Sequence, residues 1–217
     1  MNRWPSPLYV ICDVALCQQA GWDPVVFAEA CFDAGATVLQ VRAKQLASGP
    51  LTDLADAVVR AAEPFGALVI VNDRPDVARV ASAGGVHLGQ DDVPPSAARL
   101  CLGTRVRVGL STHTPEQIAS AVADSALDHI AIGPVFATTT KPTGYNAVGC
   151  SGVRLAAQAA AARQLPVIAI GGISLDRAPQ VLEAGASAVA VISDLMSSDP
   201  SERVRAYLDR LGARRRV

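Results

Sequence analysis

The sequence predicts an α/β fold, a single-domain (β/α)8 TIM barrel, from three observations. Eight short runs of β-branched and small apolar residues recur along the 217-residue chain. Alanine-rich segments of helical period separate these runs, and a strand followed by a helix, repeated eight times, is the pattern of this barrel. Half of the residues are apolar and 18% are charged, so the chain has ample material for a buried core.

The apolar runs are the predicted strands. Each run is nearly continuous in apolar residues rather than alternating, which is typical of parallel strands that are buried on both faces. The predicted strands cover residues 8–13, 37–42, 68–73, 85–89, 106–111, 129–135, 166–171 and 188–193.

The helical segments are recognised by the signals at their ends. Asp23 and Pro24 are a favourable N-cap and first helical residue, and Gly35 follows the last turn. Thr114 and Gln117 have the spacing of a capping box. The predicted helices cover residues 24–34, 51–62, 75–83, 174–184 and 200–211, and a further helix begins after Thr114.

A doubly wound open sheet is the alternative architecture, but its five or six strands would leave two strand–helix units unplaced. No linker rich in proline, glycine or serine divides the chain, so we expect residues 1–217 to form one domain. Residues 212–217 are locally basic and are expected to be a flexible tail. The longest loop, 138–149, follows the sixth strand, and loops of that length are often functional.

Composition and charge exclude several classes of function. The formal net charge is −1, so a general electrostatic attraction to nucleic acid is not expected. No apolar stretch is long enough to span a membrane and no export signal is recognisable, so the expected location is the cytoplasm. The five cysteines form no CxxC pair, which fits free thiols in a reducing compartment. The three histidines lack the spacing of metal ligands.

Polar side chains follow the predicted strands at their carboxyl ends, where barrel enzymes carry their active sites. Gln40, Arg42 and Lys44 are spaced by two, so they are expected to project toward the mouth of the barrel. Two cations and an amide in such a row favour an anion with several oxygen atoms. A row of surface salt bridges is the alternative interpretation.

Two carboxylates end adjacent strands beside these cations. Asp73 and Asp92 could hold Mg²⁺ together with substrate phosphates, or they could form simple ion pairs with the cations. Magnesium with a diphosphate fits the mixed charge best, and ion pairing stays open as the alternative.

A second anion site is predicted after the seventh and eighth strands. Gly171 and Gly172 precede the helix start expected at Ser174, and Ile192 and Ser193 lead toward the last helix. Loops at these positions often bind phosphate through backbone N–H groups, and glycine keeps that approach open. A tight turn without a ligand is the alternative. A reaction that joins a diphosphate to a monophosphate would use both sites.

Seven segments of the sequence, taken in order, resemble those of the thiamine-phosphate synthase family, over roughly residues 8–211. The segments are Gln40-Val-Arg-Ala-Lys44, Asn72-Asp-Arg74, Gly85-Val-His-Leu-Gly-Gln-Asp-Asp92, Gly109-Leu-Ser-Thr-His-Thr114, Gly133-Pro-Val-Phe-Ala-Thr-Thr-Thr-Lys141, Gly171-Gly-Ile173 and Val191-Ile-Ser193. The resemblance implies condensation of a hydroxymethylpyrimidine diphosphate with a hydroxyethylthiazole phosphate through a pyrimidine-methyl cation. A carboxylated form of the thiazole phosphate stays open as the substrate.

The resemblance also implies a role for each matched residue. Mg²⁺ would be held by Asp73 and Asp92. The pyrimidine diphosphate would be held by Gln40, Arg42, Lys44, Asn72, Ser111 and Lys141, of which Lys141, Arg42 and Ser111 would be catalytic. The thiazole phosphate would be held by Thr138, Thr139, Thr140, Gly172, Ile192 and Ser193. The expected partners are small phosphorylated substrates, without nucleic acid or membrane, and homo-oligomerisation stays open.

The sequence departs from the family pattern at two positions. Ala43 stands where many members carry an acidic residue, and Asp91 stands where many have glutamate. Ala43 is expected to face away from the mouth, and neither residue is an expected ligand. A thiazole tautomerase on the same barrel and a non-catalytic phosphate-binding regulator are the alternative functions, but the complete set of cations and carboxylates favours the synthase.

Overall fold

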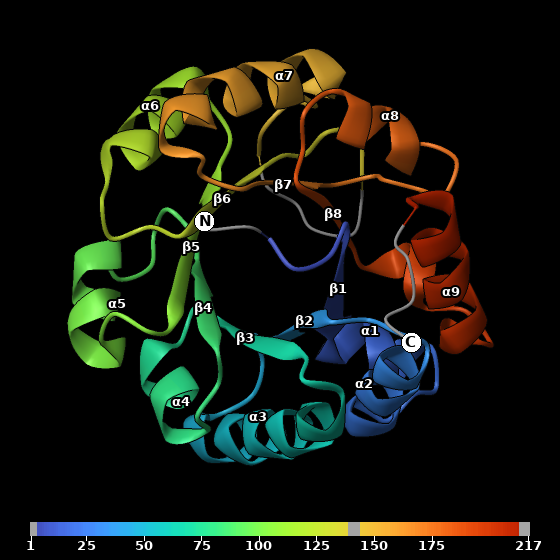
Figure 1. Cartoon of the computed structure of the whole chain (residues 1–217). Coiled ribbons are helices and arrows are strands. Elements are labelled where there is room, and N and C mark those ends of the chain that lie inside the picture. Colours follow the sequence, from blue (N-terminus) through green and yellow to red (C-terminus); the bar gives the residue numbers. More distant parts are fainter. Residues whose placement is uncertain (1–3, 139–143, 213–217) are drawn as a thin grey trace.

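The computed structural model describes residues 4–138 and 144–212, and its strands close into a parallel barrel in the order β1 to β8. Figure 1 looks along the barrel axis, with helices surrounding the strands. The strands are β1 Leu8–Asp13, β2 Val38–Arg42, β3 Leu68–Asn72, β4 Gly85–Leu88, β5 Arg107–Thr112, β6 His129–Ile132, β7 Val167–Ile170 and β8 Ala188–Val191. The predicted (β/α)8 TIM barrel is confirmed, and the open sheet is excluded because β8 pairs with β1.

The helices are α1 Val14–Gln19, α2 Pro24–Asp33, α3 Ser48–Ala62, α4 Pro75–Val80, α5 Pro95–Leu102, α6 Pro115–Ala123, α7 Gly149–Ala160, α8 Ala178–Glu183 and α9 Pro200–Arg210. Three 3₁₀ helices, η1 Glu63–Phe65, η2 Ala161–Arg163 and η3 Ser193–Leu195, complete the described elements. In the described part of the chain, none of these helices is long and apolar enough to cross a membrane.

The end signals of several helices are confirmed, but one is wrong. The side chain of Asp23 accepts hydrogen bonds from the first turn of α2, and Thr114 accepts one from the backbone N–H of Gln117. The helix expected to begin at Ser174 begins only at Ala178, with Arg177 as its N-cap residue. Residues 175–177 form turns instead, because Pro179 fits best in the first turn of a helix and fixes the start close to itself.

Two apolar layers hold the fold together. The larger layer lies between the strands and the surrounding helices. The smaller layer fills the inside of the barrel with Trp4, Tyr9, Ile11, Val38, Ile70, Ala131, Ile168, Ala188 and Ala190. Consecutive side chains of a strand point to opposite faces, so each strand contributes to both layers, and this explains why the runs in the sequence are continuously apolar.

Trp4 fills the barrel interior at the amino-terminal ends of the strands. Its indole is 7% exposed and lies against the rings of Tyr9 and His129, with ring centroids 5.3 and 4.7 Å apart. The guanidinium of Arg107 lies 5.8 Å from the indole centroid. The described segment before β1 therefore lies across one end of the barrel, as Figure 1 shows.

We expect Trp4→Ala to lower the free energy of unfolding by about 3–5 kcal/mol, because it removes a buried indole from the barrel interior. Thermal and denaturant unfolding measure this. Leu100→Ala is the matched control, since that side chain is 87% exposed and its loss is expected to cost less than about 0.5 kcal/mol. Equal stability of the two variants would contradict the role given to Trp4.

Candidate active site

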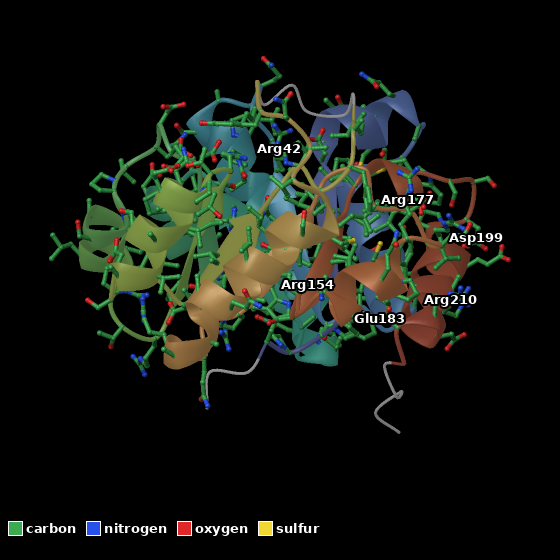
Figure 2. All side chains as sticks on the ribbon, turned by 90° about the horizontal axis from the view of Figure 1, so that it is seen from above. Arg42, Arg154, Arg177, Glu183, Asp199 and Arg210 are labelled. Carbon is green, nitrogen blue, oxygen red and sulfur yellow. The ribbon has the colours of Figure 1, made fainter. Side chains whose placement is uncertain are left out.

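A cavity of about 350 Å³ opens inside the barrel, lined largely by residues at the carboxyl ends of the strands. Figure 2 shows the barrel from the side, with Arg42 near the upper end and Glu183 and Arg210, the last residues of α8 and α9, lower down. The predicted site residues that line the cavity are Gln40, Arg42, Asn72, Ser111, Thr138, Gly172, Ile192 and Ser193. The structure therefore brings residues from both predicted anion sites to one cavity.

Strand β2 places an amide and a guanidinium in the cavity wall. Gln40 is buried, and its Nε2 donates a hydrogen bond of 2.8 Å to the hydroxyl of Tyr9. Arg42 forms an ion pair with Asp13, which lies directly opposite it in the register of β1 and β2. Asp13 was not identified from the sequence, although its place at the carboxyl end of β1 was a usable signal. Ala43 packs toward the outer layer, as expected.

Lys44 lies outside the residues that line the cavity, which corrects the prediction of one row along β2. The strand ends at Arg42, so the alternation of side chains does not extend to Lys44. Its ammonium lies 2.7 Å from the carboxylate of Asp73 and is 46% exposed. The ion pairing that was left open as the alternative is thus present at this position, and a charge pair of this exposure adds little stability.

Asp73 and Asp92 form a close carboxylate pair next to Asn72. The backbone of Asp73 has a φ of 65°, a left-handed conformation that aspartate adopts more readily than most residues. Asp92 accepts a hydrogen bond of 2.6 Å from the backbone N–H of Gly89. Partial burial raises the pKa of Asp92, and the neighbouring Asp73 carboxylate raises it further, while the Gly89 N–H and Lys44 act in the opposite direction.

The donor set of this pair fits a hard divalent cation that keeps other ligands. Two carboxylates that repel one another would both be stabilised by Mg²⁺, which is usually bound through one or two carboxylates plus substrate phosphates. Among residues 4–138 and 144–212, no group of three or more His, Cys, Asp or Glu side chains is arranged to hold a metal alone. A cation here would therefore need oxygens from the substrate or water.

Two histidines, one in the cavity wall and one fully buried, were not identified from the sequence. His87 lines the cavity wall, and its Nε2 lies 3.0 Å from Ser111 Oγ. Its Nδ1 lies 3.2 Å from Nε2 of the fully buried His129. A sequence search for metal-ligand spacing overlooks such a pair, because the two residues come from β4 and β6 and meet only across the barrel interior.

Gly171 and Gly172 have φ values of 103° and 63°, so both adopt conformations that favour glycine. A Cβ atom on Gly172 would lie 2.7 Å from the carbonyl oxygen of Ala137 and 2.9 Å from Cβ of Phe136. The tight turn that was the alternative interpretation is therefore present. Close packing of Gly172 against the segment after β6 already requires a residue without Cβ. The helix N-terminus expected directly after these residues is absent, since α8 begins at Ala178.

The β8 side of the cavity carries Ile192 and Ser193, where η3 begins. Thr138, after β6, also lines the cavity. Thr139, Thr140 and Lys141 lie outside the described residues, so their predicted roles stay predictions.

Comparison with known proteins matches most of the chain. Residues 8–195 match the family described as thiamine monophosphate synthase. The chain is 44% identical over 192 residues to a thiamine-phosphate synthase of Acidothermus cellulolyticus, covering 88% of this chain and 89% of that protein. It is 38% identical over 192 residues to a thiamine-phosphate synthase of Chloroflexus aurantiacus, covering 88% and 86%.

A solved structure shares the architecture. The structure described as thiamine phosphate pyrophosphorylase from Pyrococcus furiosus superposes with a TM-score of 0.83 at 29% identity, covering 94% of this chain and 95% of that one. The sequence and structural similarities extend over the strands that line the cavity. The chain therefore belongs to the thiamine monophosphate synthase family and has the function of a thiamine-phosphate synthase, a transferase of thiamine biosynthesis.

Proposed function

We propose that the chain joins a hydroxymethylpyrimidine diphosphate to a hydroxyethylthiazole phosphate and releases thiamine phosphate and diphosphate. The observation that carries this proposal is the two-sided cavity. One side holds Arg42 and Asn72 next to the carboxylate pair, and the other holds Gly172 and Ser193. Two substrates, one with a diphosphate and one with a monophosphate, suit a cavity with an anion site on each side.

On the first side, Arg42 would bind the diphosphate through two parallel N–H donors, a geometry that a guanidinium provides and an ammonium does not. Gln40, Asn72 and Ser111 would supply neutral hydrogen bonds, and Lys44 a further positive charge. The sequence assigns Lys141 to the same diphosphate. Asp13 would hold the Arg42 guanidinium in place through their ion pair.

Asp73 and Asp92 would hold Mg²⁺ on the same side, and the bound cation would offset the negative charge of the leaving diphosphate. Lys44, which contacts Asp73, would keep that carboxylate oriented. On the other side, Thr138, Gly172, Ile192 and Ser193 would surround the thiazole phosphate. The family resemblance adds Thr139 and Thr140 to this group.

The chemistry requires charge stabilisation more than proton transfer. The bond between the pyrimidine methylene carbon and the diphosphate oxygen breaks, and its electron pair leaves with the diphosphate. The lone pair of the thiazole nitrogen then forms the new C–N bond. Because this nitrogen has no proton to lose, no general base is needed, and the chain's contribution is to orient the two rings and stabilise the departing anion.

Release of diphosphate with both substrates and Mg²⁺ present tests this proposal. A thiazole tautomerase would convert the thiazole phosphate alone and release no diphosphate, and a phosphate-binding regulator would bind without turnover. The carboxylate pair and the Arg42 site favour the synthase over both. We also propose the cytoplasm as the location, in line with the free state of all five cysteines.

We expect Asp73→Ala to reduce Mg²⁺-dependent turnover by on the order of 10²-fold, since charge stabilisation by a bound cation contributes several kcal/mol to the transition state. Steady-state rates across a Mg²⁺ titration measure the loss, and circular dichroism confirms the fold. Asp76→Ala is the matched control, because that exposed carboxylate pairs with Arg74 outside the cavity. Wild-type activity of Asp73→Ala with unchanged Mg²⁺ dependence would refute the metal assignment.

We expect Gly172→Ala to lower the melting temperature by about 2–8 °C, because a left-handed φ costs a residue with Cβ about 1–2 kcal/mol. The close contact with Ala137 adds to this cost. Gly49→Ala is the control, since a Cβ there meets nothing within 4 Å and alanine favours helix α3. If the melting temperature is unchanged and only KM for the thiazole phosphate rises, Gly172 is required for phosphate access and not for packing.

A further inference from the structure

Three polar side chains form a continuous path from the buried interior to the cavity. His129 Nε2 lies 3.2 Å from His87 Nδ1, and His87 Nε2 lies 3.0 Å from Ser111 Oγ. The histidines are 0% and 7% exposed, whereas Ser111 lines the cavity. The protonation of the buried end of this path therefore decides how the serine hydroxyl at the other end is oriented.

Burial favours the neutral form of the imidazole at the buried end. Burial lowers the pKa of His129 well below its usual value, and the neighbouring His87 and Arg107 lower it further. A neutral imidazole carries its proton on one ring nitrogen and offers a lone pair at the other. Two directions of hydrogen bonding along the path are therefore conceivable, one for each tautomer of His129.

The surroundings of His129 select between these directions. Its Nδ1 is buried and has no hydrogen-bond partner among the described residues, and the same is true of Trp4 Nε1. The two rings are in contact, with centroids 4.7 Å apart. An indole nitrogen is only a donor, so a proton on His129 Nδ1 would leave two unpaired N–H groups in the same buried interior. A lone pair on Nδ1 avoids this.

We propose that His129 is a positioning residue whose Nε2 proton sets a directed relay toward the cavity. His129 Nε2–H donates to His87 Nδ1, and His87 Nε2–H donates to Ser111 Oγ. Because a lone pair of the serine oxygen is then occupied, its O–H proton points away from His87 and is available to an acceptor in the cavity. The identity of this acceptor rests on the proposed function: it is an oxygen of the pyrimidine diphosphate.

Gly109 leaves the space that the ring of His129 occupies and so fixes where its Nε2 lies. It lies directly opposite His129 in the register of β5 and β6, and a Cβ there would come within 2.0 Å of His129 Nε2. Glycine weakens the interior of a strand and is kept where another group must approach closely. The group that approaches Gly109 is the nitrogen that faces His87.

The first test is independent of substrate. The chain has three histidines, so ¹⁵N spectra of histidine-labelled protein, assigned with His87→Gln, His113→Gln and His129→Gln, report which ring nitrogens are protonated. We expect protons on Nε2 of His129 and Nε2 of His87. A proton on Nδ1 of either of these two residues, or a doubly protonated ring at neutral pH, overturns the relay.

The second test is kinetic. His129→Phe keeps an aromatic ring but removes the hydrogen-bond donor. We expect kcat to fall by on the order of 10–100-fold, as for other groups that orient a ligand-binding residue. KM for the thiazole phosphate is expected to stay unchanged. His129→Gln, whose Nε2–H has a similar reach, is expected to restore most of the rate. Phe27→Leu, which disturbs only the outer layer, controls for lost stability.

A double-mutant cycle separates positioning from a merely structural effect. If His129 acts through Ser111, then His129→Phe costs nothing further in a Ser111→Ala background. Losses that multiply in the double variant, or a Gln variant as poor as the Phe variant at equal stability, overturn the proposal. Failure of the proposed function gives a different result from failure of the relay. The wild-type chain would then release no diphosphate, while its histidine spectra would stay as expected.

Discussion

Closure of eight parallel strands into a barrel is the constraint on which the rest of the structure depends. Closure aligns all carboxyl ends in one ring, so short polar segments that are far apart in sequence come to surround one cavity. It also creates an interior that must be filled at one end and open at the other. Trp4, Tyr9 and Ile168 fill it, while Ala131 and Ala190 reach the cavity wall and take up little space there.

Charge at the open end is arranged in pairs. Arg42 contacts Asp13, and Lys44 contacts Asp73. These carboxylates hold the cations in place when no anion is bound, and a phosphorylated ligand would find its donors already oriented. Asp92 adds a carboxylate beside Asp73. Burial raises the pKa of Asp92 most, and the nearby Asp73 carboxylate raises it further. Such a charge pattern suits the cation and the anion that the proposed function requires.

The fold was predictable because its signal is repeated. Continuous apolar runs reflect burial on both strand faces, and that property is independent of distant partners. Signals of local geometry were less secure: Ser174 resembles an N-cap residue, yet α8 begins at Ala178 because Pro179 controls the start. The spacing of Gln40, Arg42 and Lys44 predicted a common side, but β2 ends at Arg42 and the third residue leaves the pattern.

Residues of the candidate site that directly follow a strand were predictable from the sequence. Contacts between side chains that meet across the barrel interior were not. Asn72 and Ser111 line the cavity as their positions indicated. The contacts between His87 and His129 and between Gln40 and Tyr9 depend on strand register and barrel closure, which a single sequence does not specify. Gly109 is informative only after its neighbour is known, because its small size matters through the ring of His129.

The central claim is that one cavity holds the diphosphate and the monophosphate on opposite sides. A crystal structure of the chain with thiamine phosphate, diphosphate and Mg²⁺ tests it most directly. We expect diphosphate to bind against Arg42 and Asn72, and Mg²⁺ to bind between Asp73 and Asp92. The phosphate group of thiamine phosphate is expected beside Gly172 and Ser193. A structure with Mg²⁺ away from both carboxylates, or with both phosphate groups on the same side of the cavity, would contradict it.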